Sequence, residues 1–194
     1  MICKMKAFEI KEFKYNKEEL KKVYLNNNNE WAKYGKDEKL TLHTQYVSLE
    51  HPIILKHIQQ IKNYKDIVEN VKFFKTLVNA GVGPHTDKRN VAINIPIEVD
   101  DKSYVVFYEA KETLDSVLSL KDKVRYTTAK YFKLENAKSI ETFKCQNVFC
   151  IDTSLVHGVV NESEKDRVIL SISFKDKYND FDVIKNMYEN GELL

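Results

Sequence analysis

The sequence has few of the residues that interrupt or cross-link a chain. Among its 194 residues are only five glycines, three prolines and three cysteines. The cysteines, Cys3, Cys145 and Cys150, are odd in number and lack Cys-x-x-Cys spacing, which argues against a disulfide framework and a cysteine zinc site. We therefore expect a reduced, cytoplasmic protein in which Cys150 packs as a small hydrophobe within the run NVFCI.

Long apolar runs and a charge excess are also missing. No stretch of about 18 apolar residues occurs, and the segment MICKMKAFEIKEFK lacks the apolar core of a signal peptide, so we expect no membrane association. Lysine and arginine together number 31 against 29 aspartates and glutamates, a formal net charge of +2. This balance gives no strong case for a nucleic-acid or anionic-membrane partner, and the lysine clusters, interleaved with acidic residues, indicate solvated faces.

The whole chain is 43% hydrophobic and 31% charged, which is the composition of a globular protein. Its length fits a single domain over residues 1–194. Helical spacing occurs in residues 17–24 and in HPIILKHIQQIKNY, where Pro52 suits a first helical turn. From about residue 70 the chain changes to short runs rich in Val, Ile, Phe and Tyr. These runs are VKFFKTLVNA, VAINIPIEV, SYVVFYEA, AKYFKL, NVFCID and RVILSISF, with GVGP interpreted as a turn.

Most of these runs follow one another without an intervening helical pattern, which disfavours a parallel β-α-β fold. We expect a mainly β protein with flanking helices, whose core is an antiparallel jelly roll of the cupin-like, double-stranded β-helix type. Residues 1–69 are expected to form a helical and strand support region, and residues 70–175 the jelly-roll core. Residues 176–194 are expected to contain an amphipathic C-terminal helix that covers a sheet or mediates dimerisation.

Three side chains have the pattern of a metal site. The stretch GVGPHTDKRNVAINIPIE places His85 and Asp87 two positions apart, so that on a strand both share one face. His157, from a distant strand, can complete a triangle on one side of an ion, which is the facial triad of non-haem Fe(II) oxygenases. Arg167, opening the last strand, can hold the distal carboxylate of a dicarboxylic co-substrate. A lone His-x-Asp also occurs as a surface turn, but His157 and Arg167 favour the metal site.

With these residues the chain resembles the Fe(II)- and 2-oxoglutarate-dependent dioxygenases, which share His-x-Asp, a distant His, and an Arg about ten residues later. The resemblance rests on the motifs HTD, VHG and DRVILSIS. The segment GVGPHTD, which contains the first motif, looks most like prolyl or aspartyl/asparaginyl hydroxylases. The resemblance implies that His85, Asp87 and His157 bind Fe(II) and that Arg167 binds the co-substrate 2-oxoglutarate, with O2 as oxidant. Ile169 stands where many members carry a Ser or Thr, so Ser171 is considered as a co-substrate contact instead.

Further site residues are candidates with ordinary structural alternatives. The resemblance implies a tyrosine on an early strand against the co-substrate, for which Tyr104 and Tyr108 both qualify. Asn94, inside VAINIPI, is a candidate for binding co-substrate or substrate, or a purely structural residue. Arg89 is a candidate for a substrate carboxylate or for a solvent-facing ion pair, and Trp31 for a substrate mouth or for core packing. The remaining histidines, at positions 43, 51 and 57, are expected to be structural.

The resemblance implies an enzyme that hydroxylates an unactivated C–H bond, with an amino-acid side chain, peptidyl or free, as the expected substrate. Decarboxylation of 2-oxoglutarate would yield succinate and CO2. A nucleic-acid dealkylating oxygenase with the same iron site and a non-catalytic jelly-roll binding module are the alternatives. A zinc or manganese cupin that does not use 2-oxoglutarate is a further one, and Arg167 argues against it. The ligand set does not distinguish hydroxylation from desaturation, and the sequence does not indicate an oligomeric state.

Overall fold

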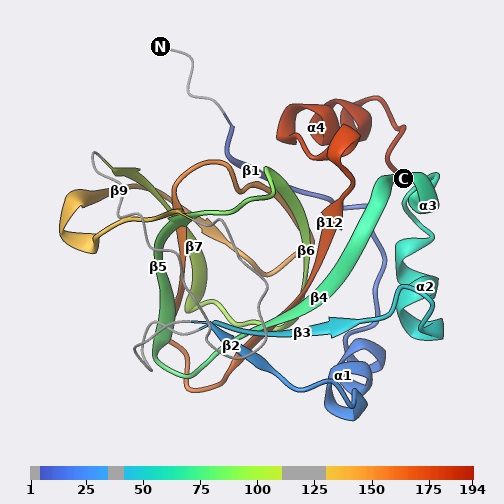
Figure 1. Cartoon of the computed structure of the whole chain (residues 1–194), viewed down its shortest axis with the longest axis horizontal. Helices are drawn as coiled ribbons and strands as arrows, with labels where there is room; N and C mark the ends of the chain where they lie inside the picture. Colours follow the sequence, from blue (N-terminus) through green and yellow to red (C-terminus); the bar gives the residue numbers. More distant parts are fainter. Residues whose placement is uncertain (1–4, 35–41, 111–129) are drawn as a thin grey trace.

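The computed structural model describes residues 5–34, 42–110 and 130–194, whose strands form two facing β-sheets (Figure 1). The strands are β1 (Ala7–Glu9), β2 (Ala32–Tyr34), β3 (Leu42–Val47), β4 (Val68–Thr76), β5 (Ala80–Thr86), β6 (Val91–Glu98), β7 (Ser103–Ala110), β8 (Lys130–Tyr131), β9 (Ala137–Lys144), β10 (Phe149–Asp152), β11 (His157–Asn161) and β12 (Arg167–Phe174). The helices are α1 (Lys17–Asn26), α2 (Pro52–Ile58), α3 (Tyr64–Ile67) and α4 (Phe181–Glu189), and short 3-10 turns lie at η2 (Leu134–Asn136) and η3 (Asp176–Tyr178).

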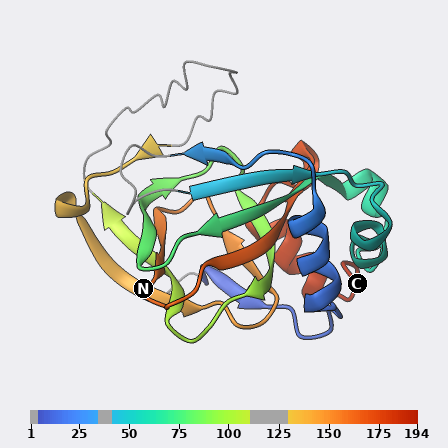
Figure 2. The same cartoon turned by 90° about the horizontal axis from the view of Figure 1, so that it is seen from below.

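The larger sheet has seven strands in the order β1-β10-β6-β12-β4-β3-β2, and the smaller has five in the order β8-β5-β11-β7-β9. Figure 2 shows β2, β3, β4 and β12 following one another across the larger sheet. All neighbouring strands are antiparallel, as the short runs without intervening helices predicted. The mainly β, jelly-roll prediction is confirmed, and β1, β2 and β3 of the support region extend the larger sheet.

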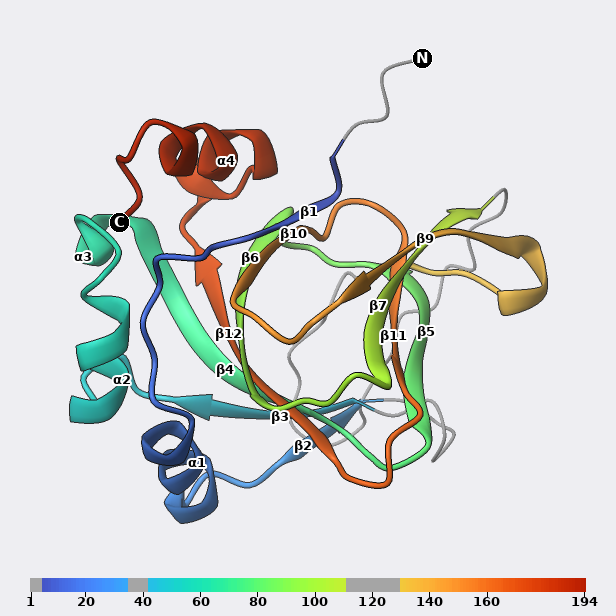
Figure 3. The same cartoon turned by 180° about the vertical axis from the view of Figure 1, so that it is seen from behind.

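The larger sheet has a mainly apolar outer face and a mixed inner face, because side chains alternate along a strand. On β12 the outward residues Val168, Leu170, Ile172 and Phe174 are buried in the main hydrophobic core together with residues of α1, α2 and α4. Their neighbours Arg167, Ile169, Ser171 and Ser173 face the smaller sheet instead. The helices gather outside the larger sheet (Figures 1 and 3), so the inner face does not have to supply the main core.

The helices begin where the sequence provides caps. The Asn16 side chain accepts hydrogen bonds from the amides of Glu18 and Glu19 at the start of α1, and Pro52 occupies the first turn of α2. The His57 ring bonds the Ile53 carbonyl through Nδ1 and accepts from the Asn16 amide through Nε2, so its role is structural as predicted. In α4, Phe181 and Ile184 are buried against the main core, so this helix covers the larger sheet.

Several strands were not predicted, among them the short edge strands β1 and β2. The segment GVGP, interpreted as a turn, belongs to β5, and β9 has a largely exposed sequence that gave no apolar signal. Cys145 and Cys150 are buried free thiols, as expected for Cys150, whereas Cys3 lies outside the described residues. Within the described ranges no helix is long and apolar enough to span a bilayer.

The glycines of β5 and β11 allow these strands to approach closely. A Cβ added at Gly81 would lie 2.5 Å from the Val159 carbonyl oxygen, and one at Gly158 would lie 2.6 Å from that of Val82. By contrast, a Cβ at Gly83 would have nothing within 4 Å. The missing side chains at positions 81 and 158 are therefore a packing requirement.

Replacing Gly81 with alanine is expected to destabilise the protein by about 1–3 kcal/mol, because the clash is with main-chain atoms that cannot rotate away. Gly83→Ala is the matched control on the same strand and should change stability by less than about 1 kcal/mol. Urea unfolding followed by the fluorescence of Trp31, the sole tryptophan, measures both. Equal unfolding midpoints for the two variants would contradict the steric argument.

Candidate metal centre and its pocket

A β-bulge aims His85 into the space between the sheets. Opposite β11, His157 pairs with His85 and Val159 pairs with Val82, so β5 takes one more residue than β11 over this interval. Two strand residues an odd number of positions apart normally face opposite sides of a sheet. Because of the extra residue, His85 and Val82 instead face the same side, and both line one pocket. The bulge therefore brings the rings of His85 and His157 to a centroid distance of 4.4 Å.

Both histidine rings are oriented by main-chain carbonyls. Nδ1 of His85 lies 2.8 Å from the Gly83 carbonyl oxygen, and Nδ1 of His157 lies 2.9 Å from that of Leu155. Because a carbonyl only accepts, each Nδ1 carries the proton and each Nε2 offers a lone pair. Such partners fix the tautomer of histidines that bind metals.

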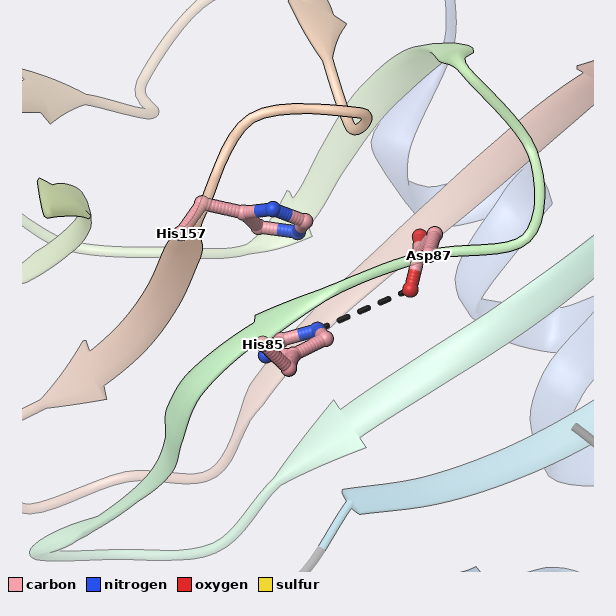
Figure 4. A group of neighbouring side chains, drawn as sticks. All are labelled: His85, Asp87 and His157. Carbon is pink, nitrogen blue, oxygen red and sulfur yellow. Dashed lines mark ion pairs between the residues drawn. The ribbon is translucent and has the colours of Figure 1, made fainter. Parts of the chain in front are cut away.

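Asp87 directly follows β5 and completes the cluster (Figure 4). Its Oδ1 lies 3.6 Å from Nε2 of His85, and one possible ligand atom from each of His85, Asp87 and His157 lies within 4.8 Å of the others. Its amide donates to the Thr153 carbonyl at 2.9 Å, which fixes the main chain of the loop. The sequence prediction that these three residues converge on one face is thus met by the geometry.

Arg89 holds the other carboxylate oxygen. Its Nε donates to Oδ2 of Asp87 at 2.9 Å, and its Nη1 donates to the hydroxyls of Ser171 and Ser173, both at 3.0 Å. The guanidinium also lies 5.2 Å from the centre of the Phe74 ring. Arg89 therefore joins the loop after β5 to the inner face of β12 and leaves Oδ1 of Asp87 directed at the histidines.

The protonation states suit a cation. Burial opposes ionisation of Asp87, but Arg89 and the two histidines outweigh it and hold the pKa of the carboxyl at about 2. Burial, with His85 as the next cause, lowers the pKa of His157 to about 4. At neutral pH Asp87 is therefore an anion and His157 a neutral imidazole, the forms that bind metals. The donor set of two imidazoles and one carboxylate fits Fe(II).

The three residues line a pocket of about 790 Å³ between the sheets, within the usual size range for small-molecule sites. Arg167 lies where β12 begins, opposite Thr76 of β4, and is 2% exposed. Its Nε has no hydrogen-bond partner among the described residues, and the Cys145 thiol contacts the guanidinium. A buried cation with an unused donor fits an anionic ligand.

Other predicted residues are placed differently. Tyr104 and Tyr108 alternate with the inward-facing Val105 and Phe107, so both lie on the outer face of the smaller sheet, and the expectation of a co-substrate contact is corrected. Trp31 packs edge-on against Tyr24 beside the main core, which corrects its assignment to a substrate mouth.

Ser171, expected to contact the co-substrate, is fully buried and accepts from Arg89, so the structure gives it a supporting position instead. Arg89, expected to bind a substrate carboxylate, does line the pocket but commits Nε and Nη1 to protein groups. Asn94 lines the pocket, is 6% exposed, and its Oδ1 has no hydrogen-bond partner within the described ranges.

Several pocket residues were not predicted. They lie on β3 and β4 at alternate positions and include Thr44, Asn70, Lys72 and Phe74. Alternation from Asn70 into the run VKFFKTLVNA would have grouped the last three on one face, but nothing in the sequence indicates that this face is the inner one.

The chain is similar to one known protein family and to several solved structures. A family model described as aspartyl/asparaginyl β-hydroxylase matches residues 5–177, whereas no curated protein matches significantly. Among solved structures, the non-heme alpha ketoglutarate dependent epimerase SnoN from nogalamycin biosynthesis has a TM-score of 0.51 at 8% identity, covering 82% of this chain and 70% of that chain. SnoN in complex with Fe3+, alpha ketoglutarate and nogalamycin RO gives the same TM-score of 0.51 and 8% identity, over 82% and 72% of the two chains. A 2OG-Fe(II) oxygenase family protein from Burkholderia pseudomallei has a TM-score of 0.49 at 11% identity, over 80% and 76%.

Removing the Arg89 side chain tests its hold on Asp87. Arg89→Met is expected to weaken Co(II) binding by about 10–100-fold, the usual effect of losing a partner that orients a metal ligand. The neighbouring Lys88→Met is the matched control, because it removes the same charge without a contact to Asp87. Loss of a positive charge alone would tighten cation binding, so unchanged or tighter binding in Arg89→Met, measured by absorbance titration, would contradict the orienting role.

Proposed function

Because the chain belongs to the aspartyl/asparaginyl β-hydroxylase family, we propose that this oxygenase uses Fe(II), 2-oxoglutarate and O2 to hydroxylate an unactivated C–H bond of an amino-acid side chain. The observation that carries the proposal is the convergence of one possible ligand atom each from His85, Asp87 and His157 to within 4.8 Å in a pocket that also contains Arg167. SnoN, of similar fold, is described in complex with Fe3+ and alpha ketoglutarate, which supports the choice of metal and co-substrate.

The three ligand residues would hold Fe(II) on one side only. His85 and His157 present Nε2, and Asp87 presents Oδ1, while the pocket lies before them. A facial set of protein ligands leaves the remaining positions of the ion to exchangeable molecules. Bound there, iron with 2-oxoglutarate and O2 supplies the oxidising power to break an unactivated C–H bond.

Arg167 would receive the distal carboxylate of 2-oxoglutarate. Its guanidinium is the only cation among the fully buried large side chains of the described residues, and its Nε is unused. Apolar side chains of the same pocket, at Leu42, Val82, Val159 and Ile169, provide a wall for the methylene carbons of the acid. The strands that carry these side chains would position the bound acid beside the metal ligands.

Anaerobic titration with Fe(II) and then 2-oxoglutarate tests the proposal. The wild type is expected to develop a visible metal-to-ligand charge-transfer band, which His85→Ala abolishes because a ligand is lost. Arg167→Met should retain the band but require about 10–100-fold more 2-oxoglutarate, since a charged hydrogen bond to the carboxylate is removed. His43→Ala is the control, because His43 lies on the strand face turned away from the pocket.

A wild-type protein that binds Fe(II) but shows no band at saturating 2-oxoglutarate would overturn the co-substrate assignment. Unchanged 2-oxoglutarate affinity in a folded Arg167→Met variant, with folding checked by circular dichroism, would overturn the role of the arginine alone.

A further inference from the structure

The pocket has two chemically different ends. At one end, where β12 begins and β4 ends, Arg167 lies opposite Thr76. At the other end, where β4 begins and β12 ends, Ser173 lies opposite Asn70. The pocket lining at this second end consists of polar and charged side chains from β3, β4, η3, the residue after η3 and the loop after β5. They are Tyr46, Glu69, Asn70, Lys72, Lys88, Asp176 and Asn179. If Arg167 takes the co-substrate, this end remains for the substrate.

A row of polar side chains crosses the larger sheet beside this end. Asn94 of β6 is directly opposite Ser171 of β12, Ser171 is opposite Lys72 of β4, and Lys72 is opposite Tyr46 of β3. Arg89 bonds Ser171 and so occupies the middle of the row, next to the carboxylate of the metal cluster. Asn94 and Lys72 therefore flank the place where Asp87 and Arg89 meet the sheet.

Several of these groups are unused by the protein. Asn94 is 6% exposed and Asn70 also faces the pocket, yet the Oδ1 of each is buried without a hydrogen-bond partner among the described residues. Buried carboxamides normally have partners, and a ligand supplies them where the protein does not.

The charges of the same end are also unpaired. The Lys72 ammonium lies 4.7 Å from the centre of the Tyr46 ring, and Lys72 forms no ion pair within the described ranges. Neither Glu69 nor Asp176 has an ion-pair partner there, although charges elsewhere do pair, as Lys21 does with Glu98. Unpaired cationic, anionic and amide groups around one pocket fit a small molecule that carries both charges.

We propose, building on the proposed function, that the substrate is a free amino acid whose α-amino and α-carboxylate groups are both charged. Lys72 binds the carboxylate, and the carbonyl oxygens of Asn94 and Asn70 accept hydrogen bonds from the ammonium group. A side chain within a folded protein has neither charge beside it, because both main-chain groups are in peptide bonds. These contacts thus hold the α-carbon end of the amino acid, while its side chain points toward the metal cluster.

The test uses the anaerobic protein loaded with Fe(II) and 2-oxoglutarate. An equimolar mixture of the twenty free L-amino acids is added first, and then the same mixture as N-acetyl amino-acid amides, in which both charges are removed. The free mixture is expected to shift the charge-transfer band and, once air is admitted, to raise succinate production. The capped mixture should do neither. Single amino acids then identify the one responsible.

Lys72→Met tests the carboxylate site. It is expected to raise the concentration of the active amino acid needed for half of the band shift by about tenfold or more, because a charge-assisted hydrogen bond is lost. The titration with 2-oxoglutarate should stay as in the wild type. Lys75→Met is the matched control, since Lys75 lies on the same strand but on the outer face, over the Trp31 ring.

Other outcomes overturn the proposal in distinguishable ways. An equal response to the capped mixture, or equal affinity in Lys72→Met, would show that the charges are not recognised. No response to either mixture while the charge-transfer band forms would also overturn it, in favour of a larger or differently charged substrate, and would leave the proposed function intact. Failure of the band itself would instead overturn the proposed function.

Discussion

The main-chain contact between β5 and β11 is the constraint on which the candidate metal centre depends. Each strand supplies one histidine, and the two histidines are direct cross-strand partners. The strands can approach this closely only because positions 81 and 158 carry no Cβ, which would meet a carbonyl oxygen at 2.5 and 2.6 Å. The bulge beside Gly83 then turns His85 inward and presents the carbonyl that fixes its tautomer. Backbone packing, rather than a side-chain network, sets the distance between the two imidazoles.

Arg89 extends this local arrangement to the other sheet. It bonds Asp87 on one side and two serines of β12 on the other, and β12 also carries Arg167 at its first residue. The proposed iron site and the proposed co-substrate site are therefore attached to one buried strand, whose outer side chains are held by the helix-covered core. A shift of β12 would displace both sites together. The packing of α1, α2 and α4 against the outer side of this strand therefore helps to hold both sites in position.

The sequence indicated the site residues whose type and spacing suggest their chemistry without knowledge of their spatial neighbours. It did not indicate the residues whose roles depend on which strands pair and in which register. His85, Asp87, His157 and Arg167 have types and spacings that few structural roles require, and the structure brings the first three together and places the fourth in the same pocket. The orientation of Tyr104 and Tyr108 depends instead on which face of β7 is buried, and apolar residues occur on both of its faces. The partners of Arg89 lie 82 and 84 positions away, a pairing that only the sheet register determines.

In the larger sheet, the inward side chains are available for binding a ligand, whereas most outward side chains stabilise the fold. Thr44, Asn70, Thr76, Asn94 and Arg167 each have a buried side-chain atom without a partner in the described ranges, and all occupy inward positions of the larger sheet. Leaving such a group unsatisfied costs about 1–3 kcal/mol. Most outward positions of β4, β6 and β12 are apolar and belong to the main core, which offsets this cost. A ligand that supplies partners to these inward groups gains binding free energy from side chains on strands that the outer core already holds in place.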